Sequence, residues 1–339
     1  MAWSAWLVGL RQKTTMKTVF VSETSFAKAQ ATFEAINSTQ VGFRFEPAPD
    51  DEKPLASLVR EHRVQGFIAD LAPYRGPLYE ALGRGGVISR YGVGIDSIDR
   101  ARAKKAGVTI CNTPGVLDNA VAEHAVWMLG ALARPVAKAY GEMHHGQWQP
   151  AQGIEVRGRH VTVLGCGRIG RALARKLGLG LDMIVTGYDI LENPHFGEDG
   201  GISRYTNNLD KALGHADFVI CLLPVLAATR HIANADFFSK MKPGARFINS
   251  ARGALVDEPD LYDALVSGHL SGAALDVFEC EPYQPVDPAK DLRELPQVIL
   301  TPHIGSNTEE SNAAMARTAA ENIITCLTKG PKACPNRIP

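Results

Sequence analysis

The sequence lacks a charge imbalance and any apolar run long enough to cross a membrane. Its 36 basic residues equal its 36 acidic residues, so no global charge attracts it to nucleic acid or to an anionic membrane. No apolar segment approaches the roughly 20 residues that a transmembrane helix needs. We therefore expect small-molecule partners, with no nucleic-acid and no membrane partner.

The six cysteines are scattered along the chain, and none forms a C-x-x-C pair. This spacing is not typical of structural zinc sites, nor of the disulfide frameworks of small secreted domains. His144 and His145 are adjacent, which prevents both from binding one ion from the same helix face. We therefore expect no metal site and a reducing, cytoplasmic environment.

No tandem repeat or low-complexity segment interrupts the 339 residues, which suffice for two domains. The first residues, MAWSAWLVGLRQKTTM, are apolar and then basic, as in a loose extension or a degenerate targeting peptide. The apolar part is short, and it has no basic lead and no clear cleavage site. We therefore expect an N-terminal extension over residues 1–16, with Met16 as a possible natural start before a strand at 17–22.

Strand and helix patterns alternate along the chain, which predicts an α/β fold with doubly wound parallel sheets. In the first region the expected strands are 17–22, 41–45, 66–69, 87–90 and 108–111, and the expected helices are 26–36, 55–63 and 77–82. This region has no glycine-rich phosphate-binding turn, so we expect it to bind substrate. The second region is expected to contribute six strands.

One glycine-rich turn, within VTVLGCGRIG at 161–170, connects a short apolar strand to a helix. A second apolar strand follows and ends at Asp189. This order is typical of a dinucleotide-binding unit. Gly165 would permit the tight turn, Gly167 would let a pyrophosphate approach the backbone, and Gly170 would let the helix pack closely on the strand.

Two further features of this unit indicate the cofactor. The backbone N–H groups of Arg168, Ile169 and Gly170 would bind the phosphates at the positive end of the helix dipole. Asp189 would accept hydrogen bonds from the adenosine ribose, and its charge would repel a 2′-phosphate. No Arg or Lys lies in residues 190–201 to offset that charge, so NAD is favoured over NADP.

Three later loops follow predicted strands and carry polar side chains. Ligands of open α/β sheets bind at the carboxyl ends of strands, so these loops should converge on the cofactor crevice. The loops are NSARGALVD at 249–257, LDVFECEP at 275–282 and LTPHIGSN at 300–307. Each contributes one candidate catalytic residue: Arg252, Glu281 and His303.

These three residues suit hydride transfer to a ketone. His303 can move the accompanying proton near neutral pH. Glu281 would orient the imidazole ring and favour its protonated form. Arg252 would clamp a substrate carboxylate and polarise the adjacent carbonyl. Each alone could be an ordinary surface or loop residue, but their occurrence together after a nucleotide motif favours catalysis.

Seven segments within residues 85–324 resemble, in order, the D-isomer-specific 2-hydroxyacid dehydrogenase family. They are YGVGIDSID at 91–99, GVTICNTPGV at 107–116, AVAEHAV at 120–126, VTVLGCGRIGRALA at 161–174, NSARGALVDE at 249–258, GAALDVFECEP at 272–282 and TPHIGS at 301–306. The resemblance implies a Rossmann NAD-binding domain of residues 115–303, inserted into a flavodoxin-like substrate domain of residues 17–114 and 304–339. It also implies hydride transfer between NAD and C2 of a small D-2-hydroxyacid or 2-ketoacid.

The resemblance further implies roles for single residues. Arg252 is the substrate-binding arginine, and Glu281 with His303 is the catalytic pair. The helix from Asn119 joins two subunits, which implies a homodimer. Backbone groups meet the substrate carboxylate at Gly92, Val93 and Gly94. Asp276 contacts the nicotinamide carboxamide, and the other implied cofactor contacts are Pro224, Thr229, Ser250, Ala251 and Gly305.

Three positions indicate which properties of the family and of its related enzymes apply to this chain. Leu223 precedes Pro224 where the family usually has Thr or Cys, which puts one polar cofactor contact in doubt. Related formate dehydrogenases carry glutamine in place of the catalytic glutamate, so Glu281 argues against formate. Phosphite dehydrogenases carry lysine where Val93 aligns, so Val93 argues against phosphite.

The substrate and one alternative function stay open. Arg75 and Arg90 near the expected substrate loop would suit 3-phosphoglycerate, whereas Tyr74 and Tyr91 suit a less charged acid. Glyoxylate, hydroxypyruvate and pyruvate are the other candidates, and we favour a small hydroxyacid slightly. The alternative is an NAD(H)-sensing scaffold similar to the C-terminal-binding-protein corepressors, which keep the Arg, Glu and His. No extended disordered tail is evident for recruiting partners, which favours the enzyme.

Overall fold

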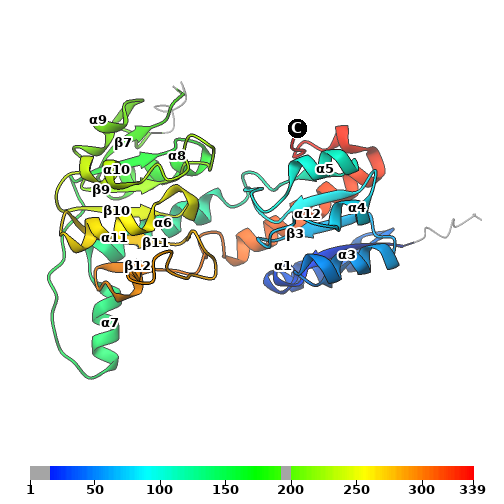
Figure 1. Cartoon of the computed structure of the whole chain (residues 1–339), viewed down its shortest axis with the longest axis horizontal. Coiled ribbons are helices and arrows are strands. Elements are labelled where there is room, and N and C mark those ends of the chain that lie inside the picture. The colour runs from blue at the N-terminus through cyan, green and yellow to red at the C-terminus, as the bar shows by residue number, and fades with distance from the viewer. Residues whose placement is uncertain (1–15, 192–199) are drawn as a thin grey trace, which may run out of the picture. The chain divides into compact units, whose positions relative to one another are not determined.

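The computed structural model describes residues 16–191 and 200–339, which form two compact α/β units (Figure 1). Of the described residues, those up to Leu117 and Thr308–Pro339 form one unit, and those within Asp118–Asn307 form the other. The second unit is thus an insertion between two parts of the first, and its boundaries fall a few residues beyond 115 and 303. Residues 1–15 of the expected extension lie outside the described residues.

The first unit is built on a five-stranded sheet in which every pair of neighbours is parallel. The strand order is β2-β1-β3-β4-β5, which is the flavodoxin-like order. The strands are β1 (Lys17–Ser22), β2 (Phe43–Ala48), β3 (Gly66–Ala69), β4 (Val87–Arg90) and β5 (Thr109–Cys111). The helices are α1 (Glu23–Lys28), α2 (Gln30–Thr39), α3 (Glu52–Glu61), α4 (Leu78–Leu82), α5 (Arg100–Ala106) and α12 (Glu309–Lys329).

The structure corrects local predictions in this unit. The helix expected over 26–36 is two helices, because Ala29 leaves the helical region with φ −135° and ψ 33°. The strand expected over 41–45 begins at Phe43 and includes Pro47, which is tolerated because β2 lies at the edge of the sheet. Helix α5 was not predicted, although Asp99 caps it by accepting a hydrogen bond from the N–H of Arg102.

The longest helix, α12, was also not predicted. It packs on β3 and β4 of the first unit (Figure 1). The contact is close, because a Cβ placed on Gly66 of β3 would lie 2.7 Å from Cγ2 of Ile323. The helix gave a weak apolar signal because many of its buried residues are small or polar, among them Ser311, Asn312, Ala316, Ala319, Ala320 and Asn322.

The second unit contains a seven-stranded parallel sheet with the order β12-β11-β10-β9-β6-β7-β8. The strands are β6 (His160–Leu164), β7 (Ile184–Tyr188), β8 (Arg204–Thr206), β9 (Phe218–Cys221), β10 (Ala245–Asn249), β11 (Leu270–Leu275) and β12 (Val298–Leu300). Three-residue β8 is the strand beyond the six expected. The order is that of a Rossmann fold, and the chain reverses direction across the sheet between β6 and β9. The predicted fold class is confirmed.

Helices cover both faces of this sheet. Successive strand residues alternate between two cores: Val219 packs with α10 and α11, whereas Phe218 and Ile220 pack with α6 and α8. The helices are α6 (Asp118–Ala133), α7 (Val136–His144), α8 (Arg168–Arg175), α9 (Leu209–Leu213), α10 (Ala235–Lys240) and α11 (Glu258–Val266). None of the helices within residues 16–191 and 200–339 is long and apolar enough to span a membrane.

Candidate active site

The three glycines of the turn after β6 have three different environments. Gly165 has a φ of +93°, and a Cβ there would lie 2.7 Å from the carbonyl oxygen of Leu222. A Cβ on Gly170 would clash with the carbonyl oxygen of Gly165, so only glycine lets α8 approach β6 this closely. At Gly167 no atom lies within 4 Å of an added Cβ, which leaves this side of the turn open.

The first turn of α8 presents backbone N–H groups. Gly167, the N-cap residue, supplies no side-chain cap. The N–H groups of Arg168, Ile169 and Gly170 therefore lack an intrahelical acceptor at the positive end of the helix dipole. The guanidinium of Arg168 pairs with Asp118, with Nε 2.6 Å from Oδ2, so the backbone of Arg168 is the predicted phosphate contact.

Asp189 follows β7 and lies beside the glycine turn. Its Oδ2 accepts a hydrogen bond from the N–H of Cys166 at 2.9 Å, and its carbonyl oxygen accepts one from the hydroxyl of Tyr205 at 2.7 Å. The second carboxylate oxygen has no hydrogen-bond partner in the described part of the chain. The position and charge of this side chain fit the ribose contact predicted for it.

A dinucleotide fits these surroundings. Besides the open side at Gly167, the hydroxyl of Ser250 is buried and has no partner among the described residues. Ser250 follows β10, one strand beyond β9, which neighbours β6. Thr229, another predicted contact, instead stabilises its own loop by donating to the carbonyl oxygen of Pro224 at 2.7 Å and accepting from Leu226.

Glu281 and His303, which lie 22 residues apart in the sequence, are in contact. Nδ1 of His303 lies 2.7 Å from Oε2 of Glu281, and the two side chains are 22% and 32% exposed. The N–H of Phe278 donates to the other carboxylate oxygen of Glu281 at 3.0 Å. The ring is therefore held through Nδ1, which leaves Nε2 as the nitrogen that can exchange a proton.

Asp276 organises the loop that carries His303. Its side chain is 1% exposed, and it accepts hydrogen bonds from the Thr301 hydroxyl at 2.6 Å, the Ile304 N–H at 2.9 Å and the Gly305 N–H at 2.8 Å. The carbonyl oxygen of Asp276 also accepts the N–H of His303 at 2.8 Å. The structure therefore gives Asp276 a positioning role beside the cofactor contact that the resemblance implies.

His124 is a residue at this site that our sequence analysis did not single out. Its Nε2 lies 3.3 Å from Oδ1 of Asp276 and 3.2 Å from the hydroxyl of Thr301. Burial alone would raise the pKa of the Asp276 carboxyl, but hydrogen bonds from His124, Thr301 and the Ile304 N–H outweigh burial and lower it. Asp276 is thus an ionised, buried anchor for this loop. The AVAEHAV segment was the available signal for His124.

Arg252 lies after β10 in extended backbone, with φ −150° and ψ 142°. Its carbonyl oxygen accepts a hydrogen bond from the Asn249 amide at 2.9 Å, and its Nη1 donates to the carbonyl oxygen of Ala251 at 2.6 Å. Since β10, β11 and β12 are neighbours in the sheet, the loops carrying Arg252, Glu281 and His303 leave three adjacent strands.

Glu258 supports the loop that carries Glu281. It is 3% exposed and accepts the N–H of Glu279 at 2.8 Å. A Cβ on Gly253 would clash with the backbone of Phe278, so that glycine is needed for the close approach. Burial, with smaller contributions from neighbouring acids, raises the pKa of Glu258 from 4.5 to about 6.

We expect the Glu258→Gln variant to alter how stability depends on pH. Because the pKa is raised in the folded state, the stabilising contribution of neutral Glu258 is complete below pH 4.5 and is lost as the pH rises through 6. In urea unfolding followed by circular dichroism, the stability of the wild type relative to the variant should fall by roughly 2 kcal/mol between pH 4 and 7. Glu61→Gln, at an exposed position, is the control. An equal pH dependence for wild type and Glu258→Gln would contradict this role.

The predicted carboxylate-binding residues of the first unit lie in a turn after β4. Gly92 has a φ of +139°, and its N–H donates to the hydroxyl of Thr113 at 3.0 Å. The amide of Asn112 donates to the carbonyl oxygen of Val93 at 2.8 Å. The turn is therefore held by residues that follow β5, and the role of Gly92, Val93 and Gly94 stays a prediction.

Three of the residues that we used to compare phosphorylated with less charged substrates are buried in the structure. Arg90 is 5% exposed and its Nη1 lies 3.8 Å from Oδ1 of Asp70, so it supports the core beneath Gly92 rather than reaching a phosphate. Tyr74 and Tyr91 are 0% and 3% exposed. Arg75 stays exposed, and it donates to the carbonyl oxygen of Asp96 at 2.6 Å.

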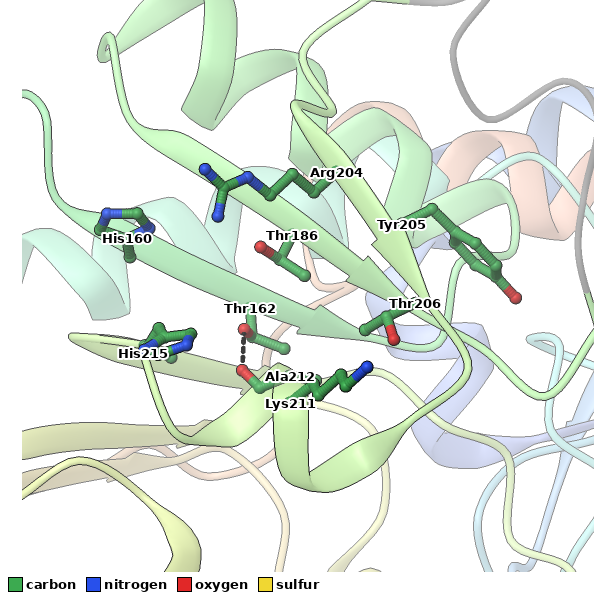
Figure 2. A pocket seen from close by; sticks show the side chains of 10 residues that line it. His160, Thr162, Thr186, Arg204, Tyr205, Thr206, Lys211, Ala212 and His215 are labelled. Atoms are coloured by element: carbon green, nitrogen blue, oxygen red, sulfur yellow. Dashed lines mark hydrogen bonds between the residues drawn. The ribbon is translucent and has the colours of Figure 1, made fainter.

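A cavity of about 460 Å³ lies in the second unit between strands β6 to β8 and α9 (Figure 2). Its lining includes Thr162, whose hydroxyl donates to the carbonyl oxygen of Ala212 at 2.6 Å. Arg204, Lys211 and His215 also line it. None of the predicted site residues is among its lining residues, so this cavity is distinct from the glycine turn.

A dinucleotide-binding sheet in which the loops after adjacent strands carry a histidine–glutamate pair and an arginine is typical of nicotinamide-dependent dehydrogenases. Residues 126–305 match the family described as D-isomer specific 2-hydroxyacid dehydrogenase, NAD binding domain. The chain belongs to this family.

Relatives and solved structures agree with this assignment. The chain is 35% identical over 286 residues to a glyoxylate reductase of Korarchaeum cryptofilum, covering 82% of this chain and 84% of the relative. It is 36% identical over 240 residues to a hydroxypyruvate reductase of Thermotoga maritima, covering 70% and 76%. An NADPH-dependent glyoxylate/hydroxypyruvate reductase of Sinorhizobium meliloti, solved with NADP and malonate, superposes with a TM-score of 0.81 at 27% identity, covering 96% and 97%.

The protein is therefore an oxidoreductase that acts on hydroxyacids with a nicotinamide cofactor. This confirms the predicted enzyme class and favours it over the corepressor-like scaffold.

Proposed function

We propose that the protein reduces small, unphosphorylated 2-ketoacids, of the glyoxylate or hydroxypyruvate type, with NADH. The observation that carries the proposal is the contact of His303 with Glu281. Glu281 lies on the loop after β11 and His303 on the loop after β12, and the loop of Arg252 follows β10, the neighbour of β11. The burial of Arg90 removes one of the two cations considered for a substrate phosphate. Glyoxylate and hydroxypyruvate are the substrates in the names of the relatives above.

Each residue of the site has a separate role in the reaction. A reduced nicotinamide cofactor supplies the hydride when bound at the glycine turn. Arg252 binds the substrate carboxylate through its planar fork and polarises the neighbouring carbonyl. His303 donates the proton from Nε2 to the carbonyl oxygen as that oxygen gains negative charge.

Glu281 and Asp276 position the acid. The carboxylate of Glu281 accepts Nδ1–H, which places the transferable proton on Nε2. Asp276 holds the chain on both sides of His303, through the hydroxyl of Thr301 and through the N–H groups of Ile304 and Gly305. We assign Asp276 and His124 to positioning rather than to proton transfer.

Asp189 supports the preference for NAD over NADP. Its carboxylate is held beside the glycine turn by the Cys166 N–H, and its other oxygen, which has no partner among the described residues, can accept from a ribose hydroxyl. A 2′-phosphate at that position would be repelled by the carboxylate. Pro224, Ser250 and Ala251 are proposed as further contacts on the same cofactor.

We also propose a cytoplasmic homodimer that forms through α6 and α7. Large apolar side chains on these helices are exposed, among them Trp127 at 70%, Val136 at 63% and Tyr140 at 67%. Several exposed large apolar side chains on two consecutive helices support an interaction surface there. All six cysteines are free thiols, which suits a reducing compartment.

A substrate panel tests the proposed function. Glyoxylate, hydroxypyruvate, pyruvate and phosphohydroxypyruvate would be assayed by NADH and NADPH absorbance. We expect the highest kcat/KM for glyoxylate or hydroxypyruvate with NADH, about 10-fold or more above the phosphorylated acid and above NADPH. Faster turnover of the phosphorylated acid would contradict the proposed substrate class, and turnover of none of the ketoacids would contradict the proposed reaction.

A further inference from the structure

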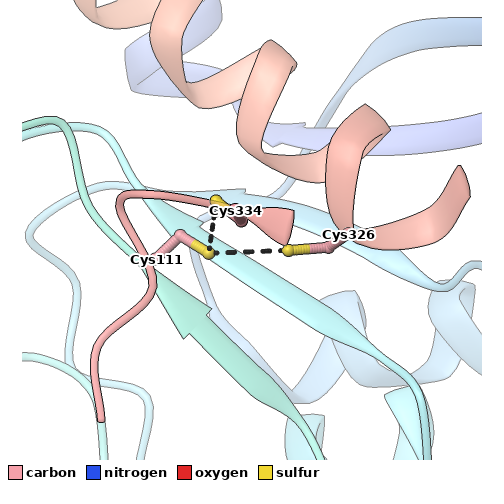
Figure 3. Close-up of side chains that lie close together, drawn as sticks. All are labelled: Cys111, Cys326 and Cys334. Carbon is pink, nitrogen blue, oxygen red and sulfur yellow. Dashed lines mark hydrogen bonds between the residues drawn. The ribbon is translucent and has the colours of Figure 1, made fainter. Parts of the chain in front are cut away.

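Three buried cysteines from distant parts of the sequence meet in the first unit (Figure 3). Cys111 ends β5, Cys326 lies on α12, and Cys334 follows the short helix Pro331–Ala333. Their residues are 0%, 5% and 5% exposed. Within residues 16–191 and 200–339, this is the only group of three or more potential metal ligands whose ligand atoms come so close together.

The separations of the sulfur atoms match those around a single ion. Sγ of Cys111 lies 3.8 Å from Sγ of Cys326 and 3.6 Å from Sγ of Cys334, and all three sulfurs lie within 4.8 Å of one another. Zn–S bonds are about 2.3 Å long, so two thiolates on a tetrahedral zinc ion are about 3.8 Å apart. The cluster therefore needs little rearrangement to bind zinc.

We propose that Cys111, Cys326 and Cys334 form a binding site for a divalent thiophilic cation of the zinc class. The site is independent of the proposed enzymatic function, because it lies wholly in the first unit and shares no residue with the glycine turn or with the His303 loop. It would join β5, α12 and the C-terminal segment, so its role is to stabilise the first unit.

Asn322 is the candidate fourth ligand. It lies one turn before Cys326 on α12, and its Oδ1 accepts from the Asn336 amide at 3.0 Å and from Sγ of Cys334 at 3.3 Å. Loss of the Cys334 proton on metal binding would release the second of these bonds. Nδ2 of Asn322 donates to the hydroxyl of Ser89 at 3.1 Å and to the carbonyl oxygen of Asn112 at 2.9 Å. These bonds fix the amide so that its oxygen points towards the cluster, as orienting partners do around metal ligands.

The cluster can lose protons to a metal. Each metal–sulfur bond replaces an S–H bond, and the proton leaves to solvent, so binding should strengthen as the pH rises.

The charges of the complex are also compatible with this site. Three thiolates around a divalent ion carry one net negative charge, which would be costly to bury alone. The positive charge of the Arg337 guanidinium acts on Cys326 and would offset that net charge. A disulfide is a different outcome, because one pair would have to close from 3.6 or 3.8 Å to about 2.05 Å and would leave the third thiol unused.

Cobalt titration of the reduced, chelator-treated full-length protein tests the site. We expect one equivalent of Co²⁺ to bind with thiolate-to-metal charge-transfer absorption in the near ultraviolet, and one equivalent of Zn²⁺ to displace it. Cys326→Ala should weaken binding by more than about 100-fold, since even groups that only orient metal ligands are worth 10- to 100-fold. Cys221→Ala, which removes a buried thiol of the other unit, should bind like the wild type.

Several outcomes would overturn the site. One is the absence of charge-transfer absorption at one equivalent of Co²⁺, and the other is equal binding of Co²⁺ by the wild type and by Cys326→Ala. Circular dichroism checks the fold of each variant, and Cys334→Ser, close to the chain end, replaces Cys326→Ala if that variant does not fold. In the wild type alone, an unchanged thermal unfolding midpoint with and without Zn²⁺ would contradict the stabilising role.

Discussion

Replacing His303 with alanine should reduce kcat by about 10²- to 10⁴-fold, the range that a positioned general acid contributes. The hydride can still be delivered in this variant, but the ketone oxygen then gains negative charge without a proton donor. KM should change little, because Arg252 rather than His303 is assigned to the substrate carboxylate. Steady-state kinetics with glyoxylate and NADH would measure both constants.

The matched control for this variant is His62→Ala, which removes an exposed imidazole at the C-terminal end of α3 in the other unit. It should retain wild-type kinetics. A second check is cofactor binding by NADH fluorescence, which His303→Ala should keep. Wild-type kcat in His303→Ala would show that another group transfers the proton, and the assignment based on the contact with Glu281 would be wrong.

Replacing Arg252 should have the second-largest effect. In Arg252→Ala, both the carboxylate clamp and the charge that polarises the carbonyl are lost, so kcat/KM should fall by about 10³-fold or more. Arg252→Lys keeps the positive charge but loses the planar guanidinium group. We expect it to recover part of kcat while KM stays raised, because an ammonium group cannot bind the carboxylate through two parallel hydrogen bonds.

Arg157→Ala is the control for the arginine series. That side chain is 82% exposed, its Nε lies 3.6 Å from Asp182, and it should leave the kinetics unchanged. Equal loss of kcat/KM in Arg252→Lys and Arg252→Ala would show that the geometry of the guanidinium group matters more than its charge. Unchanged kinetics in Arg252→Ala would remove this residue from the site.

The glycine turn illustrates what could be predicted from the sequence. The positive φ of Gly165, the open side at Gly167 and the close packing of Gly170 each depend on residues within one strand–turn–helix unit. Sequence spacing reports such short-range requirements directly. The strand–helix alternation that led to the fold class is local in the same sense.

Elements that depend on distant partners were harder to predict. Helix α12 buries small and polar residues against β3 and β4, so its sequence shows no clear apolar stripe. Strand β8 has three residues, and it is a strand because β7 provides its hydrogen-bond partners. Arg90 was considered as a contact to a substrate phosphate, but the fold places Asp70 beside it in the core.

The amino-acid sequence by itself determined the doubly wound fold class, the dinucleotide turn and the chemistry available at Arg252, Glu281 and His303. The pairing of Glu281 with His303 was also expected from the sequence, and the structure supplied its geometry. Only the tertiary structure decided that Asp276 and His124 anchor the same loop, and that Cys111, Cys326 and Cys334 converge. The physical reason is the separation along the sequence of the residues that interact. Backbone conformation responds to neighbours within a few residues, whereas these contacts join segments that only the packing of strands and helices brings together.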